Sequence, residues 1–483
     1  MRSTTSFRDP AGQVVNVADR VLRVVAEDAT QQVLEILRSN NCETWMIDHR
    51  LVRTRVLAEQ EVEMLRLQPS VCELLDVKRW GVVLEHERIP FPSYPYEWAP
   101  EMLHAAGKLT IELATEALED SLGLKDATPY NILFRGPNPV FVDLLSFERR
   151  DPGDSTWLAY AQFTRTFLLP LIANRLFATP LDQIFTTRRD GIEPEELYRY
   201  LNATQKLSPR CISLVSIPTW LSRKRTHTKQ LYEQRRNQNP EMSRFVFRSL
   251  LRRMDRALDR LAPVARKSKW SDYLSSDNNY TPETFSAKER FFSEALSTIK
   301  PERLLDVGCN TGHFSRLAAL SGAQVVAIDY DEVVLGGLWH RAKTENLDIL
   351  PLLVNLARPS PAVGWLNSEC PSFLDRARGA FDCVCMLAVI HHMLVSERIP
   401  LPSVIDMAAD LTSDHAIIEF VEPNDSMFLR LLRGRGELHK DLTSAAFEDA
   451  CRRKFEIVRS ERIPGSFRSL YLLKKLRDGA QIS

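Results

Sequence analysis

The sequence predicts an α/β protein that combines a mostly parallel C-terminal sheet with a preceding α+β region and a basic helical segment. After residue 282, apolar runs of strand length alternate with helical patterns, as a parallel sheet requires. Before it, short strand patterns mix with helices, and residues 205–270 contain 17 Lys and Arg against 4 Asp and Glu. We therefore divide the chain into segments 1–204, 205–277 and 278–476.

The composition is that of an ordinary globular protein. Of 483 residues, 44% are hydrophobic and 26% charged, and 63 Lys and Arg balance 63 Asp and Glu, so the net charge gives no reason to expect a nucleic-acid partner. The eight cysteines include no Cys-x-x-Cys pair, which argues against a disulfide framework or a metal site. The N-terminus lacks the apolar core of a secretory signal, and no apolar stretch is long enough to span a membrane. We expect a cytoplasmic protein and leave its oligomeric state open.

The first segment begins with a turn at 9–12, and alternating valines after it predict a β-hairpin. Apolar residues recur at helical spacing further along. The expected helices cover 30–39, 58–67 and 99–122, and two short strands are expected at 132–134 and 139–144.

A second pattern consists of polar residues around those two short strands. Four residues separate Asp126 from Asn131, and Asp143 follows the second strand. This arrangement resembles the catalytic loop of the protein-kinase and aminoglycoside-phosphotransferase superfamily, where such residues place a base and metal ligands. Leu124 stands where that family usually has His, and no glycine-rich phosphate loop is present. We therefore predict a kinase-like scaffold without phosphoryl transfer, with an active phosphotransferase as the alternative.

A glycine-containing turn follows the first strand of the third segment. Residues 303–307, Arg-Leu-Leu-Asp-Val, predict a buried strand, and a helix is expected from Phe314. Between them, Gly308 and Gly312 allow the backbone to turn sharply and to approach a ligand. Asp306 places a carboxylate at the carboxyl end of the strand, where ligands of such sheets bind.

The next strand, 324–328, is followed by Asp329. A carboxylate at this distance is the group that hydrogen-bonds the ribose hydroxyls of an adenosine in doubly wound sheets. The spacing of Gly308 and Gly312 differs from the dinucleotide motif, and Asp306 would repel a pyrophosphate. The sulfonium and ammonium of S-adenosylmethionine are the cations that such a site suits.

The run from Asp306 to Gly312 followed by Asp329 resembles motifs I and II of class I S-adenosylmethionine-dependent methyltransferases. Segments 350–355, 381–394 and 415–422 resemble the later strands of that Rossmann-like fold, and 455–473 its terminal antiparallel hairpin. The resemblance implies that Asn355 reads the adenine amino group. Lys288, ahead of the first strand, is a candidate to bind the cofactor carboxylate, with a solvated helix face as the alternative. The full set of implied cofactor-binding residues is Asp306, Gly308, Cys309, Asn310, Gly312, Asp329, Tyr330, Asn355, Leu356 and Lys288.

A narrower resemblance covers most of the chain. The phrases at 358–365, 390–392 and 418–422 are similar to bacterial methyltransferases of the rhizobial host-specific nodulation group. The resemblance implies a small-molecule or glycan-type acceptor. A regulatory protein that binds S-adenosylmethionine without turnover is the alternative, as is a bifunctional protein with an active phosphotransferase.

His391 and His392 directly follow the fourth expected strand, close to the position of the transferred methyl group. Because a histidine titrates near neutral pH, either can remove the acceptor's proton, and we favour His391. The alternative is that both only cap the strand. Glu419 and Glu422 are expected to be solvated, with acceptor contact as the alternative.

A nucleic-acid acceptor is not expected. Residues 388–392 read Ala-Val-Ile-His-His, without the Asn-Pro-Pro-aromatic or Asp-Pro-Pro-aromatic signature that positions a flipped base. The basic run from Arg223 to Lys269 is interpreted as a solvated helix face or as a segment that neutralises an acidic neighbouring domain, and attraction of an anionic acceptor is the alternative.

Overall fold

The computed structural model describes residues 9–69, 71–72, 75, 79–224, 239–264, 266–268, 281–432 and 441–477. The chain folds into two compact units. Unit 1 comprises residues 1–264 and 362–371, and unit 2 comprises residues 265–361 and 372–483. Residues 225–238 and 269–277 of the expected basic connector lie outside the described residues.

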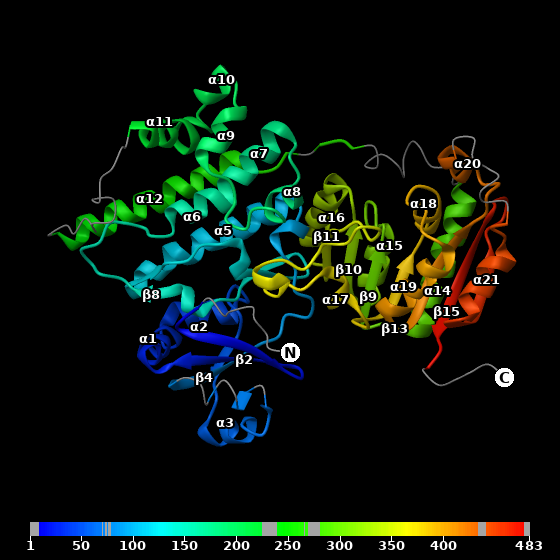
Figure 1. Cartoon of the computed structure of the whole chain (residues 1–483), viewed down its shortest axis with the longest axis horizontal. Helices are drawn as coiled ribbons and strands as arrows, with labels where there is room; N and C mark the ends of the chain where they lie inside the picture. The colour runs from blue at the N-terminus through cyan, green and yellow to red at the C-terminus, as the bar shows by residue number, and fades with distance from the viewer. Residues whose placement is uncertain are drawn as a thin grey trace. The chain divides into compact units, whose positions relative to one another are not determined.

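Unit 1 is a mixed α and β structure (Figure 1). Its larger sheet is antiparallel, with strand order β1-β2-β4-β3. Its strands are β1 (Gly12–Val17), β2 (Arg20–Ala26), β3 (Thr54–Val56), β4 (Trp80–His86), β5 (Leu122–Leu124), β6 (Ile132–Arg135), β7 (Asn138–Phe141) and β8 (Phe147–Arg149). Its α-helices are α1 (Glu27–Leu37), α2 (Asn40–Ile47), α3 (Glu59–Leu65), α5 (Pro100–Glu116), α6 (Tyr160–Phe163), α7 (Leu169–Phe177), α8 (Leu181–Phe185), α9 (Pro194–Tyr200), α10 (Ala203–Lys206), α11 (Ile217–Lys224) and α12 (Pro240–Leu261).

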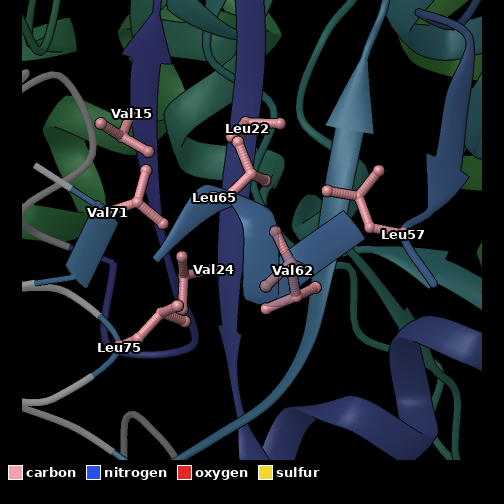
Figure 2. Packing of buried hydrophobic residues seen from close by; sticks show 9 residues of the cluster. Val15, Leu22, Val24, Leu57, Val62, Leu65, Val71 and Leu75 are labelled. Carbon is pink, nitrogen blue, oxygen red and sulfur yellow. The ribbon is translucent and has the colours of Figure 1, made fainter. Parts of the chain in front are cut away.

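One face of the larger sheet is covered by apolar side chains, as Figure 2 shows. Successive strand residues point to opposite faces, so Leu22 and Val24 share this face while Arg23 points to the other. Leu22 and Val24 pack with Val62 and Leu65 of α3 in one buried cluster. The expected N-terminal hairpin, the helix near 58–67 and the two short strands are confirmed. The other face of the sheet carries Arg23 together with buried apolar side chains such as Val25 and Leu84.

Unit 2 is built on a seven-stranded sheet with order β11-β10-β9-β12-β13-β15-β14 (Figure 1). The strands β9 to β13 are parallel, and β15 pairs antiparallel with both β13 and β14. The strands are β9 (Arg303–Val307), β10 (Gln324–Asp329), β11 (Ile349–Leu353), β12 (Phe381–Met386), β13 (Thr412–Val421), β14 (Phe455–Arg462) and β15 (Arg468–Lys475). The predicted mostly parallel sheet with a terminal antiparallel hairpin is confirmed.

Helices follow most strands of unit 2, because each parallel connection must cross back over the sheet. Helices α14 and α15 contact each other, and α19 and α21 form a second contacting pair against β12–β14. The α-helices are α14 (Pro282–Ile299), α15 (His313–Leu320), α16 (Glu332–Thr344), α17 (Phe373–Ala377), α18 (Ile390–Val395), α19 (Leu401–Leu411), α20 (Ser426–Leu432) and α21 (Ser444–Arg452). The carboxyl ends of β9, β10 and β12 therefore lie at one edge, with the candidate residues directly after them.

The division into units differs in two places from the three segments expected from sequence. Helix α12 contacts α5 and belongs to unit 1, whereas the sequence placed it in a separate connector. Residues 362–371 belong to unit 1 although the residues on both sides of them belong to unit 2. Among the helices that the structure describes, none is long and apolar enough to cross a membrane.

Candidate functional site

The turn after β9 is bonded to the end of the neighbouring strand β10. The backbone N–H groups of Gly308 and Cys309 both donate to the carbonyl oxygen of Ile328, at 2.8 and 3.1 Å. The next N–H, of Asn310, donates to Oδ2 of Asp329 at 2.9 Å. The two predicted motifs are thus joined by three hydrogen bonds, and the position of the turn is set by β10.

Both glycines of the turn have left-handed backbone conformations, with φ of 68° at Gly308 and 79° at Gly312. A Cβ atom on Gly308 would lie 2.4 Å from Cγ2 of Val389, and one on Gly312 would lie 2.2 Å from Cδ1 of Leu338. Tight packing against two other segments therefore demands glycine here, in addition to the sharp turn that the sequence indicated. The first contact also brings the turn against the segment that leads into His391.

Asp306 ends β9 as a buried carboxylate. Its side chain accepts a 2.5 Å hydrogen bond from Oγ of Ser315 and forms no ion pair with a described residue. Only 3% of the residue is exposed. Burial raises its pKa to about 6, although Ser315 and the more distant charge of Lys288 oppose the shift. A negative charge held here without a bonded cation makes the site suited to a cationic ligand.

Asp329 lies across the turn and is partly buried. Its Oδ2 accepts from Asn310, and its Oδ1 accepts from the N–H of Asp331 at 3.1 Å. Burial raises its pKa. Tyr330, the next residue, lies at the same edge with 58% of its surface exposed.

Asn355 follows β11 at the same edge of the sheet. The N–H of Val354 donates to the carbonyl of Asp329 at 2.9 Å, which holds this segment beside the acid. Oδ1 of Asn355 accepts from the N–H of Ala357 at 3.0 Å. Leu356 is buried, with 7% exposed. Both residues therefore lie at the edge of the sheet where the strand-end acids lie, and their contact with a cofactor stays a prediction.

Cys309 lies inside the turn with 7% of its surface exposed. Its Sγ approaches the carbonyl of Asn310 at 3.6 Å. Burial raises the pKa of the thiol well above its ordinary value, so it stays protonated. It fits the turn as a small side chain, and its chemistry provides no nucleophile.

A buried network of four charged side chains links α14, β13 and β15, and the charge of its Lys288 acts on Asp306. Nζ of Lys288 in α14 is 2.5 Å from Oε2 of Glu419 in β13. Nη1 of Arg468 in β15 is 3.1 Å from Oε1 of Glu419, and two guanidinium nitrogens of Arg468 bond both oxygens of Asp425 at 2.8 and 3.1 Å. Each of these residues is at most 6% exposed. Two cations balance two anions, so the network carries no net charge.

The expectation that Glu419 and Glu422 are solvated is wrong for Glu419, which is fully buried. Against the effect of burial, Lys288 and Arg468 lower its pKa to about 2. Glu422 is partly exposed and accepts from Oγ of Ser444 at 3.1 Å. A single acid between apolar neighbours at 417–421 was the signal in the sequence for a buried, paired carboxylate. Arg468, at the start of an apolar run, carried the same signal.

His391 lies in the first turn of α18 and is 3% exposed. Its Nδ1 is buried and has no hydrogen-bond partner among the described residues, and its ring centroid is 4.3 Å from that of His392. Burial lowers the pKa of His391 well below its ordinary value, and His392 and Arg468 lower it further. The imidazole is therefore neutral at physiological pH and presents an unused nitrogen. His392 is partly exposed.

In the second candidate cluster, which lies in unit 1, the polar side chains bond one another. The guanidinium of Arg23 in β2 forms an ion pair with Asp143, and Oγ of Ser146 donates to the same carboxylate. Nδ2 of Asn131 donates to Oγ of Ser146 at 2.9 Å. Oδ1 of Asp126 is buried, and no residue in the described part of the chain hydrogen-bonds it. Within the described residues, no three His, Cys, Asp or Glu side chains form a group that could hold a metal ion. The kinase-like scaffold stays a prediction.

Comparison with known proteins identifies the family. Residues 242–477 match a family model described as a methyltransferase domain. The chain is 30% identical over 480 residues to nodulation protein NoeA from Rhizobium meliloti strain 1021, covering 98% of this chain and 96% of that protein. The similarity therefore includes unit 1 as well as unit 2.

Solved structures with similar chains include two methyltransferases. The N-methyltransferase NodS from Bradyrhizobium japonicum WM9, in complex with S-adenosyl-L-homocysteine, is 14% identical, with a TM-score of 0.32, over 43% of this chain and 97% of that chain. The magnesium protoporphyrin IX methyltransferase from Synechocystis PCC 6803 is 17% identical, with a TM-score of 0.31, over 43% and 97%. The full-length similarity to NoeA, with the methyltransferase match and the turn and strand-end acids of unit 2, assigns this chain to the NoeA family of S-adenosylmethionine-dependent methyltransferases.

Proposed function

We propose that the enzyme methylates an uncharged hydroxyl or amine of a small-molecule or glycan-type acceptor, with His391 as the base. The observation that carries this proposal is the buried, unpartnered Nδ1 of His391 beside a charge-balanced network. The sequence resemblance to rhizobial nodulation enzymes and the name of the relative NoeA, a nodulation protein, support an acceptor of this class.

The residues of unit 2 suit S-adenosylmethionine. Asp306, buried without a bonded cation, is suited to the positively charged end of the cofactor, and Asp329 to the ribose hydroxyls. The amide of Asn355 and the ring of Tyr330 would contact the adenine. Lys288, expected to bind the cofactor carboxylate, is instead paired with Glu419, so we assign it to the network. The cofactor supplies an electrophilic methyl group on a sulfonium.

The charge balance of the network favours an uncharged nucleophile. A carboxylate acceptor would require a cation to hold it, but the cations Lys288 and Arg468 are bonded to Glu419 and Asp425. A hydroxyl or amine needs no cation and must lose a proton as the new bond forms. Nδ1 of His391 accepts that proton. A low pKa keeps this nitrogen unprotonated, although it also weakens its affinity for the proton.

The test is transfer of a labelled methyl group to a panel of amino sugars, chito-oligosaccharides and small phenols. We expect S-adenosylhomocysteine to form with at least one acceptor class, and His391→Asn to reduce kcat about 100-fold or more with unchanged binding of S-adenosylhomocysteine. His392→Asn is the matched control and should have a smaller effect. Equal turnover of both variants and the wild type would reject the base assignment, and cofactor binding without product from any acceptor would favour a regulatory protein.

A further inference from the structure

The helix α12 is the longest described helix of the basic segment, and none of its residues belongs to the methyltransferase site. The side chains of its inner face are buried in unit 1. Phe247, Leu251, Met254 and Leu258 are at most 3% exposed, and α12 packs against α5. Nε2 of His104 in α5 lies 3.1 Å from the carbonyl oxygen of Leu258. This face explains why the helix is amphipathic, but it leaves the opposite face unexplained.

The outward face begins with apolar side chains. Met242, Phe245 and Val246 are 49%, 64% and 43% exposed. At 100° per residue, they lie on the side of the helix opposite to its buried stripe. Three neighbouring exposed apolar residues in the first turns of one helix form a local patch, unlike a single exposed leucine.

The same outward face continues with arginines. Arg252, Arg256 and Arg260 follow one another at four-residue intervals and are exposed, with Arg253 beside them. Among the described residues, Arg252, Arg256 and Arg260 form no ion pair. Arg248, earlier in the helix, differs from these three arginines because it forms an ion pair with Glu119 at 2.6 Å.

The two acidic residues of this part of the helix offset the arginines only in part. Asp255 and Asp259 share Lys108 of α5, which compensates one of their two charges, and 59% of the Asp259 side chain is exposed. With four exposed arginines (Arg252, Arg253, Arg256 and Arg260), the outward face keeps a net positive charge. An exposed cationic stripe next to an apolar patch is the pattern of a helix that lies on a membrane surface.

We propose that the outward face of α12, from Met242 to Arg260, docks on an anionic phospholipid bilayer. Lipid phosphates neutralise the arginines, and Met242, Phe245 and Val246 enter the interface between headgroups and acyl chains. A soluble polyanion or an acidic protein surface would satisfy the arginines but would leave the apolar patch in water. The bilayer matches both halves of the face.

The test is co-sedimentation of the full-length protein with vesicles of phosphatidylglycerol and phosphatidylcholine in equal amounts. We expect binding that weakens with added salt and that is absent with pure phosphatidylcholine. Since each basic side chain near an anionic surface contributes about a five-fold factor, the triple variant Arg252→Gln, Arg256→Gln and Arg260→Gln should bind about 100-fold more weakly. Phe245→Ser should also weaken binding.

The matched control removes the same charge from exposed arginines of unit 2, with Arg303→Gln, Arg378→Gln and Arg453→Gln. It should bind vesicles like the wild type, and circular dichroism should show that all variants are folded. Equal loss in the control and the α12 variant would reject a specific face and indicate attraction by net charge alone. Wild-type binding to heparin or single-stranded DNA without binding to vesicles would overturn the proposal in favour of a soluble polyanion.

Discussion

Each unit of this enzyme has an aspartate beside the end of a strand, partly buried in unit 1 and fully buried in unit 2, and among the described residues only the first forms an ion pair. In unit 1, Asp143 bonds Arg23 and Ser146, and these partners lower its pKa in spite of burial. In unit 2, Ser315 hydrogen-bonds Asp306, no described residue forms an ion pair with it, and burial raises its pKa to about 6. The first is satisfied by the fold itself, whereas the second is left for a cation that the protein does not provide.

The difference suggests which buried charges serve stability and which serve binding. A buried ion pair has internal partners, so removing one member leaves the other uncompensated. A buried carboxylate without a cation destabilises the unliganded fold and is retained for what it binds. Substitution of these residues should therefore separate charges that stabilise the fold from charges that bind the cofactor.

The network around Glu419 should show the strongest structural dependence. Glu419→Gln leaves Lys288 without its partner and weakens the contact with Arg468, so we expect the free energy of unfolding to fall by about 4 kcal/mol. Urea titration of the full chain measures this. The double variant Lys288→Met with Glu419→Gln removes one charge of each sign and should recover part of the loss. A double variant as unstable as the sum of the single variants would contradict the coupling.

Asp143 should behave as a structural residue of unit 1. Asp143→Asn removes the charge that compensates the buried Arg23, and we expect a loss of about 3 kcal/mol in the free energy of unfolding. The affinity for S-adenosylmethionine, measured by calorimetry below the unfolding transition, should not change. A fall in cofactor affinity with intact stability would reverse the comparison between the two aspartates.

Asp306 should show the opposite pattern. Asp306→Asn keeps the hydrogen bond with Ser315 but removes the charge, and we expect about 100-fold weaker binding of S-adenosylmethionine. Because its pKa is raised by burial, the unliganded variant should gain roughly 2 kcal/mol of stability at pH 7. Calorimetry and thermal unfolding measure the two effects, and exposed Asp410→Asn is the control. Loss of stability together with affinity would indicate a purely structural residue.

The smallest expected effect is the pH dependence of the affinity for S-adenosylmethionine, which should follow the titration of Asp306. In the unliganded protein, Asp306 takes up a proton as the pH falls through about 6, whereas a bound cation favours the ionised form. The affinity for S-adenosylmethionine should therefore be constant above pH 6 and fall by up to about tenfold per pH unit below it. Calorimetric titration between pH 5 and 7.5 checks this, with Asp306→Asn as the control. A flat profile in the wild type would rule out Asp306 as the titrating group.

The sequence predicted the sheet of unit 2 and the turn well, because the relevant signals are local. Apolar runs set the strands, Gly308 and Gly312 set the turn, and strand-end acids at Asp306 and Asp329 must meet at one edge of a parallel sheet. The contact of Gly308 with Val389 was not predicted, because the two residues are 81 positions apart in the chain and meet only through the packing of two loops.

The pairing of Glu419 with Arg468 could not be predicted from neighbouring residues in the sequence. Glu419 and Arg468 meet because β13 and β15 pair antiparallel in one register, with Glu419 opposite Leu470 and Val421 opposite Arg468. A shift of one residue would turn Arg468 to the other face of the sheet. Sequence reasoning therefore described Glu419 as a solvated strand-end acid, although its apolar neighbours indicated burial.

The residue types and their order along the chain determined that this protein binds a cationic adenosine cofactor on a mostly parallel sheet, since strand periodicity and turn chemistry act between near neighbours. Which charges are compensated was decided only by tertiary structure. Asp143 and Asp306 look alike in the sequence, and the difference between them is Arg23, which reaches Asp143 from 120 residues away. Electrostatic energy depends on distance and burial in space, and neither quantity can be read from separation along the chain.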